Sequence, residues 1–149
     1  MKYSVFRRII TAFLAVTLVA ACNPNEAESE APAEIRSLPV AAAPGSMGPN
    51  LIRGADGTIV LSWNEPDGDG HALRHSRLQD GSWSDPRTVA RGDNWFVNWA
   101  DFPSVVPISR SLWAAHWLVS QEAGGYAYDI RTAVSADAGD TWSESIIPH

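Results

Sequence analysis

Four side chains within one short segment combine carboxylates with large aromatic rings. Asp93, Trp95, Trp99 and Asp101 follow one another closely there. Aromatic faces stack on the apolar C–H faces of sugar rings, and carboxylates accept hydrogen bonds from sugar hydroxyls. We therefore expect an exposed loop that binds a carbohydrate, with Trp95 and Trp99 as its platforms. The alternative for Asp101 is a turn-capping role shortly before Pro103.

A second acidic segment resembles a metal-binding loop only in part. Between Asn64 and His71, the acids Glu65, Asp67 and Asp69 are spaced like alternating calcium ligands. The segment lacks the distal bidentate glutamate and the flanking helices of an EF-hand, so a solvated hairpin loop is the preferred interpretation. The four histidines show no metal-ligand spacing. We predict no metal and no cofactor.

The segments that position these side chains are short and separated by turn residues. They are rich in β-branched and aromatic residues, with Gly, Asp and Pro between them. No window shows the sustained apolar stripe of a helix. The sequence therefore predicts an all-β, antiparallel fold. The expected strands are 50–52, 58–63, 72–77, 87–90, 104–108, 112–119, 126–134 and 145–147.

The expected strands form a repeat. One unit covers about 51–91 and the other about 104–149. Two segments of equal length, Ser76–Trp83 and Ser135–Trp142, occur at matching places in the units. Each unit predicts one four-stranded antiparallel sheet, and repeated sheets of this size are typical of propeller blades.

The second of these segments has the residue pattern of a turn that is stabilised by its own side chains. Asp137 is placed to accept backbone N–H groups, Gly139 permits a positive φ, and Thr141 is placed to bond back to Asp137. Trp142 leads into the next strand and is expected to pack on the sheet. With Ser135, these residues match the pattern S-x-D-x-G-x-T-W at every defined position. By average composition, such a match arises by chance on the order of once in 10⁴ sequences.

This pattern resembles the Asp-box of the sialidase-type β-propellers, and Ser76–Trp83 is similar to a degenerate copy of it. The segment 94–107 is also similar to bacterial lipoproteins of the exo-α-sialidase type. These resemblances span residues 51–149. They imply a sialidase-type β-propeller of which only about two four-stranded blades are present in this chain. In that family the Asp-box is architectural and lies opposite the active site, which makes Asp137 a structural residue.

The resemblance also implies a catalytic apparatus. Sialidases use an aspartate as general acid/base, a triad of arginines that binds the substrate carboxylate, and a Tyr–Glu nucleophile. Asp101 is the candidate acid/base and Arg53 a candidate member of the triad, although Arg53 lacks the usual arginine-Ile-Pro context. Arg74 and Arg131 take matching places in the repeat, which favours a role within the sheets.

The N-terminal residues have the order of features found in a secretory signal. A basic start precedes an uncharged apolar run, 9–21, which as a helix would rise about 20 Å and is too short to span a bilayer core. The run ends in Val-Ala-Ala-Cys22, which resembles a bacterial lipobox. Cys22 is the single cysteine of the chain, so it forms no intrachain disulfide. We expect 1–22 to be a lipoprotein signal peptide and Cys22 to carry the lipid; the alternative is an ordinary signal peptide.

The next segment, 23–50, is rich in Ala, Pro and Glu and has no aromatic residue. Such a segment buries too little apolar surface to offset its ordering entropy, which predicts a disordered acidic linker. Asn23 after the cysteine favours the outer membrane of the cell envelope, by analogy with such lipoproteins. The net charge of −6 argues against a nucleic-acid partner.

The length of the chain limits what the predicted blades can do. Sialidase propellers use six blades, so we expect an N-terminal fragment that is inactive alone. Three interpretations follow: part of a membrane-anchored sialidase-like glycoside hydrolase acting on terminal sugars of glycans, a non-catalytic Asp-box propeller that binds glycans or proteins, or a truncated product without function.

Overall fold

The computed structural model describes residues 34–122 and 125–148. These residues form β-strands and turns and contain no helix, which confirms the prediction of an all-β fold. The predicted signal peptide, Cys22 and the first part of the predicted linker lie outside the described residues. The fold below is that of the unit Ser37–His149.

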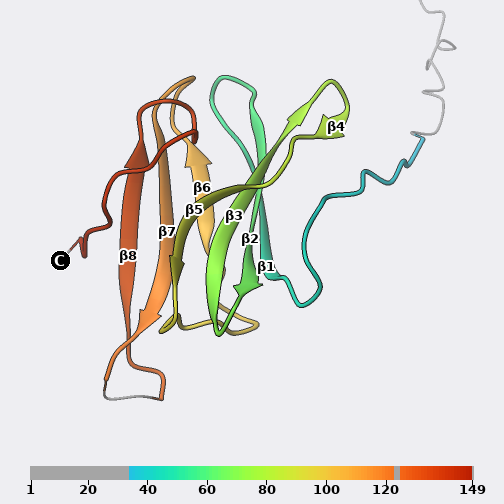
Figure 1. Ribbon diagram of the computed structural model, residues 1–149. Helices are drawn as coiled ribbons and strands as arrows, with labels where there is room; N and C mark the ends of the chain where they lie inside the picture. The colour runs from blue at the N-terminus through green and yellow to red at the C-terminus, as the bar shows by residue number, and fades with distance from the viewer. Residues whose placement is uncertain (1–33, 123–124, 149) are drawn as a thin grey trace, which may run out of the picture. The chain divides into compact units, whose positions relative to one another are not determined.

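The first sheet is antiparallel and has five strands (Figure 1). Strands β1, β2 and β3 pair in chain order, and both β4 and β5 pair with β3. The path β1-β2-β3-β5 is therefore a four-stranded sheet with a short hairpin, β3-β4, at one end. The bounds are β1 (Met47–Arg53), β2 (Ile59–Asp67), β3 (Gly70–Gln79), β4 (Ser82–Trp83) and β5 (Arg87–Gly92).

The first sheet differs from expectation at two places. Strand β1 begins at Met47, inside the segment predicted to be linker. The β2–β3 ladder continues as far as the pair Asp67–Gly70, so the expected hairpin loop is reduced to a tight turn. Gly68 makes this turn possible because it adopts a φ of 62°. The acids that resemble calcium ligands therefore lie mainly on strand ends.

The second sheet is antiparallel and has three strands in the order β6-β7-β8. They are β6 (Ser104–Pro107), β7 (Trp113–Ser120) and β8 (Tyr128–Ser135). The expected strand at 145–147 is reduced to one bridge, in which Thr132 and Ile146 exchange two backbone hydrogen bonds of 2.9 Å. This bridge occupies the edge next to β8, where a fourth strand would pair.

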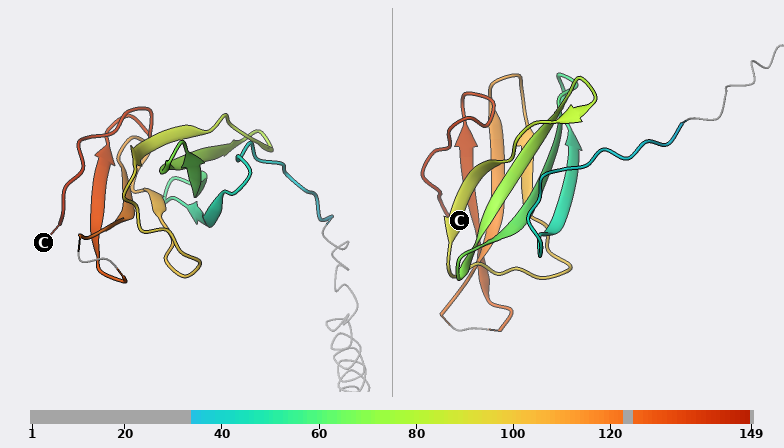
Figure 2. Two further views of the ribbon diagram at one scale, coloured as in Figure 1. Left: turned by 60° about the horizontal axis from the view of Figure 1, so that its bottom comes forward. Right: turned by 45° about the vertical axis from the view of Figure 1, so that its right-hand side comes forward.

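The core lies between the two sheets, which are side by side in Figures 1 and 2. Alternation along β7 turns Trp113, Ala115 and Trp117 towards the first sheet, because successive side chains of a strand point to opposite faces. They meet Val60 and Leu73, which are fully buried. The rest of the buried cluster is Trp95, Val105 and Ala133.

The two sheets share one pairing register. Trp63 of β2 pairs with Arg74 of β3, and Trp117 of β7 pairs with Arg131 of β8. Counting along the strands from these pairs, Leu78 of the first sheet corresponds to Ser135 of the second. The Ser76–Trp83 segment is thus offset by two residues from the sequence-based match. The first sheet closes this connection with a hairpin at Asp80 and Gly81, both of positive φ, as a type I′ turn requires.

Candidate functional site

The residues predicted to bind a carbohydrate belong to a loop that is attached to β7 on both sides. Before the loop, Phe96 N donates to Leu118 O at 3.0 Å, and Ser120 N donates to Asn94 O at 2.8 Å. After the loop, β6 pairs with the other half of β7. The segment 97–103 is therefore an excursion between two anchored stretches of one edge. Anchoring at both ends reduces the conformational freedom of its side chains.

Asn98 organises the inside of this loop. Its Oδ1 accepts the backbone N–H groups of Ala100 at 2.6 Å and of Asp101 at 3.0 Å. Its Nδ2 donates to Asp101 Oδ2 at 2.5 Å. The half-buried Asp101 carboxylate is held in one orientation, while the adjacent Trp99 side chain is 85% exposed. The loop thus carries an exposed indole two residues before an oriented carboxylate.

Trp95 does not share this exposure, and the expectation that it forms an exposed platform is wrong. It is 9% exposed and stacks on Trp117, with ring centroids 5.6 Å apart and an interplanar angle of 25°. It also bridges to Val119, so the pairing with β7 directs its ring into the core. A Cβ atom on Gly92 would lie only 2.5 Å from Trp95 Nε1, which shows how closely the backbone packs here.

Arg53 lies away from the loop. The loop meets the start of β1, where a Cβ atom on Gly48 would lie 3.1 Å from Pro103 Cδ. Arg53 pairs with Ile59 at the other end of β1, about 17 Å along the strand from Gly48. The structure therefore does not bring Arg53 together with Asp101.

Exposed aromatic residues beside the loop were missed by the sequence analysis. Phe102, within the loop, is 48% exposed. Phe96 stacks on Tyr128 with ring centroids 4.7 Å apart, and the edge-on ring of the exposed Tyr126 lies 5.9 Å from it. The spacing of the two tyrosines indicated only a strand, because the contact with Phe96 depends on a pairing distant in sequence.

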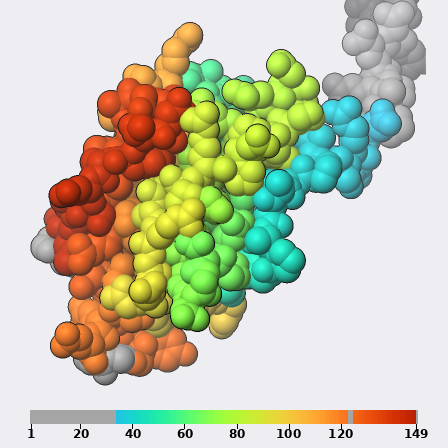
Figure 3. Space-filling model, viewed as in Figure 1, coloured from blue at the N-terminus to red at the C-terminus, as the bar shows by residue number. Residues whose placement is uncertain are grey.

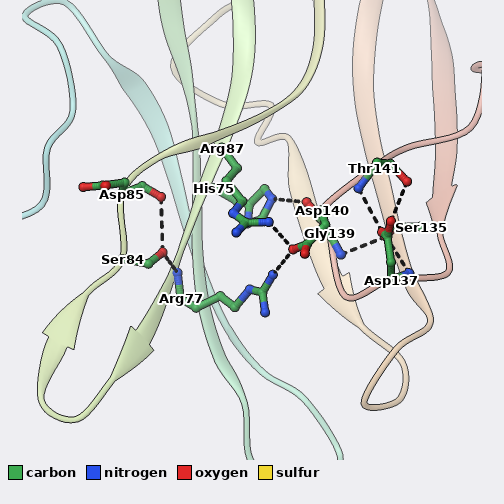
Figure 4. Close-up of polar contacts among 10 residues, drawn as sticks. All are labelled: His75, Arg77, Ser84, Asp85, Arg87, Ser135, Asp137, Gly139, Asp140 and Thr141. Atoms are coloured by element: carbon green, nitrogen blue, oxygen red, sulfur yellow. Dashed lines mark hydrogen bonds and ion pairs between the residues drawn. The ribbon is translucent and has the colours of Figure 1, made fainter.

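The Ser135–Trp142 turn has the internal bonds that its sequence suggests (Figure 4). Ser135 Oγ donates to Asp137 Oδ1 at 2.8 Å and accepts from Gly139 N at 2.8 Å. Asp137 accepts from Thr141 Oγ1 at 2.6 Å and from Thr141 N at 2.9 Å. These bonds from Thr141, followed by that from Ser135, lower the pKa of Asp137 to about 2.

The Ser135–Trp142 turn also joins the two sheets. His75 Nε2 lies 3.2 Å from Gly139 O, and both Arg77 and Arg87 form ion pairs with Asp140 (Figure 4). In Figure 3 the C-terminal residues, in red, accordingly lie directly against the yellow residues around β5. The turn follows the end of β8, at the opposite end of the sheet from loop 97–103. It is a structural joint.

Comparison with known proteins identified no relative. A scan against protein-family models, a search of curated proteins and a search of solved structures each found no match to this chain.

Arg74 belongs to a network inside the first sheet. Its Nε donates to Glu65 Oε1 at 2.9 Å, and Glu65 Oε2 accepts from Trp63 Nε1 and Ala43 N, each at 3.1 Å. Burial raises the pKa of Glu65, but the bonds from Ala43, Trp63 and Arg74 outweigh burial, so the pKa lies below its usual range. This arginine stabilises a buried carboxylate of the sheet.

Two further findings concern only residues 34–122 and 125–148. No group of three or more His, Cys, Asp or Glu side chains in this part of the chain is arranged to hold a metal ion. Nor does this part contain a helix of the length and hydropathy needed to cross a membrane.

Proposed function

We propose that this chain supplies the first two blades of a sialidase-type β-propeller, and that the propeller is a glycoside hydrolase acting on terminal sugars of glycans. Loop 97–103 carries the proposal, because it contains both the exposed Trp99 and, two residues later, the oriented Asp101 carboxylate. The lipid on Cys22 would attach the protein to a membrane of the cell envelope, and the residue after Cys22 favours the outer membrane.

Two features of the fold support this proposal. The sheets repeat one register, and the first has the four-stranded path of a propeller blade. The Ser135–Trp142 turn has the self-bonded geometry expected of an Asp-box, at the end of the sheet opposite the loop. An architectural turn at one end leaves the other end for ligands, as the resemblance implies.

In the proposed reaction, Asp101 is the general acid/base. Protonated, it would donate its proton to the glycosidic oxygen as the bond to the leaving group breaks; ionised, it would accept a proton from the attacking water. The hydrogen bonds of Asn98 would keep the carboxyl group aimed while Trp99 stacks on the sugar. The loop then combines binding and proton transfer in one rigid element.

A second candidate is a non-catalytic propeller that binds glycans. The arginines favour it: Arg53 lies at the end of the sheet opposite the loop, and Arg74 and Arg91 are paired with Glu65 and Asp67. A carboxylate-binding arginine triad draws on side chains that are free to meet the substrate. In this candidate the loop binds sugar through Trp99, and Asp101 only shapes the turn.

The experiment is an assay of fluorophore release from a fluorogenic sialoside by the intact gene product in detergent. We expect Asp101→Ala to lower turnover about 100-fold or more, the usual contribution of a general acid/base. The matched control is Asp56→Ala, which removes a carboxylate from the β1–β2 turn at the far end of the sheet. Circular dichroism checks that both variants fold.

The two candidates give different results. Unchanged turnover in Asp101→Ala removes this residue from the mechanism. Absence of turnover, together with sialoglycan binding that Trp99→Ala abolishes, supports the non-catalytic candidate. Absence of both turnover and binding contradicts both.

A further inference from the structure

The common register of the two sheets allows their surfaces to be compared residue by residue. Leu73 of β3 pairs with the residue after Trp63, and Ile130 of β8 pairs with the residue after Trp117. Leu73 and Ile130 are therefore equivalent. Leu73 is 0% exposed because the second sheet covers it, whereas Ile130 is 38% exposed. The face of the second sheet that carries Ile130 is therefore equivalent to the buried face of the first sheet, but it is exposed in this chain.

The outer face of the second sheet is mostly apolar, and its polar members are His116, Ser120 and Thr132. Its positions on β7 and β8 alternate with those that point to the core, and none of them is a Lys, Arg, Asp or Glu. Val134 is 51% exposed and Ile146 is 62% exposed. Contiguous exposed apolar side chains of this kind mark interaction surfaces. The face consists of Ala114, His116, Leu118, Ser120, Tyr128, Ile130, Thr132, Val134 and Ile146.

The first sheet has a matching face on its far side, which is open only at the edge strand β1: Trp63 on this face is 2% exposed, and Ala43 bonds to the neighbouring Glu65. Leu51 of β1 pairs with Leu61, two residues before Trp63, and Val105 of β6 pairs with Ala115, two residues before Trp117. Leu51 and Val105 are therefore equivalent, yet Leu51 is 63% exposed and Val105 is 0% exposed. Nearby, an apolar hollow of about 170 Å³ is open beside Leu61. The residues that line it are Val40, Ala42, Ser46, Met47, Pro49, Leu61 and Trp63.

We propose that these two faces bind each other in different copies of the chain, so that the outer face of the second sheet in one copy packs on the outer face of the first sheet in the next. The partner is a second copy because the equivalent inner faces, which carry Leu73 and Val105, already pack together inside each chain. The contact is head-to-tail, and such contacts close into rings when the rotation allows it. This inference rests on the proposed propeller and departs from the expected fragment, because further copies, and not a longer chain, would then supply the remaining sheets.

The first test joins the two faces covalently. One copy carries Ile130→Cys and another carries Leu51→Cys, the equivalents of Leu73 and Val105. Because packed sheets lie about 10 Å apart, we expect a covalent dimer after treatment with a bismaleimide cross-linker of about that span, and only when both copies are expressed in one cell. The unsubstituted chain, which retains Cys22, gives the background.

The outcomes of this test separate the partners. A dimer in cells that express only the Ile130→Cys copy indicates a two-fold contact and overturns the head-to-tail proposal. Absence of any dimer above background overturns the proposal as well, and leaves the faces to a different protein.

The second test is the mass of the full chain in detergent, measured by sedimentation. We expect a multiple of the mass of one processed, lipidated copy, and the mass of a single copy for the double variant Ile130→Lys, Val134→Lys. The matched control is Ile108→Lys, because Ile108 is equally exposed but lies in the β6–β7 turn outside both faces. A monomeric unsubstituted chain overturns the proposal. Neither test uses a sugar, so failure here and failure of the proposed hydrolase remain distinguishable.

Discussion

His75 is a fully buried titratable residue at the joint between the sheets. Its Nε2 donates to Gly139 O, since a carbonyl only accepts, and its Nδ1 has no hydrogen-bond partner among the described residues. Burial lowers the pKa of His75 to about 4; the bond to Gly139 and the charge of Asp140 oppose this, and Arg77 and Arg87 add to it. The joint therefore requires the neutral imidazole.

We predict that the stability of the protein falls in acid because of His75. The folded-state pKa of about 4 lies below the unfolded value of 6.5, so the stabilisation is complete above pH 6.5 and is lost as the pH falls towards 4. The loss of unfolding free energy should be on the order of 3 kcal/mol. Urea unfolding at pH 7.5, 5.5 and 4.5, followed by tryptophan fluorescence, measures it.

The variant His75→Gln should flatten this dependence, and His116→Gln, on the outer face of the second sheet, should not. Parallel losses in the unsubstituted protein and in His75→Gln would contradict the assignment. Asp137 titrates at lower pH than His75. Its pKa is lowered from 3.8 to about 2 in the folded protein, so the stability that it contributes is lost only as the pH falls through this range.

Gly139 is required for two separate reasons. It adopts a φ of 82°, and an added Cβ atom would lie 2.9 Å from both His75 Cε1 and Trp113 Cε3. We predict that Gly139→Ala lowers the free energy of unfolding by about 2–4 kcal/mol, from backbone strain and displaced core rings. The control Gly68→Ala shares the positive φ but meets open space, and should cost only about 1–2 kcal/mol. Equal losses of unfolding free energy in the two variants, measured by chemical denaturation, would show that the contacts with His75 and Trp113 add nothing to the backbone strain.

At the scale of elements, loop 97–103 depends on Asn98. We predict that Asn98→Ala increases amide hydrogen exchange across the loop several-fold, because two backbone N–H groups and the Asp101 carboxylate lose their partner. The strands on either side should keep their protection, since their ladders with β7 do not involve Asn98. Trp99→Ala is the control and should leave exchange unchanged. Unaltered exchange in Asn98→Ala would mean that anchoring alone orders the loop.

The connections that follow β3 and β8 share one pair of hydrogen bonds, although the two connections differ in length. Ser84 N donates to Arg77 O and its Oγ accepts from Arg77 N, while Ser143 makes the same two bonds with Val134. The Trp-Ser dipeptide that occurs in both connections indicates this pair of hydrogen bonds. The lengths of the two connections, however, differ by two residues, because Asp80 and Gly81 form a tight turn in the first sheet.

At the scale of the whole molecule, the sequence predicts attachment through Cys22. We predict that Cys22→Ser moves the protein from the membrane fraction to the soluble fraction, since the proposed acyl chains on Cys22 would be the anchor. Detergent phase partitioning of the two forms measures the change. Asn23→Ser, which leaves Cys22 intact, should remain in the membrane fraction. Retention of Cys22→Ser in the membrane fraction would contradict lipidation at this residue.

The sequence by itself determined the all-β class, most of the strands and the bonded turn at Ser135–Trp142. These features depend on local alternation and on contacts within a few residues, which a sequence pattern records directly. The tertiary structure alone decided that Trp95 is buried, that Arg53 lies away from Asp101, and that the outer face of the second sheet exposes apolar residues. Those outcomes depend on which strands pair and which faces meet, and such pairings join residues far apart in the chain.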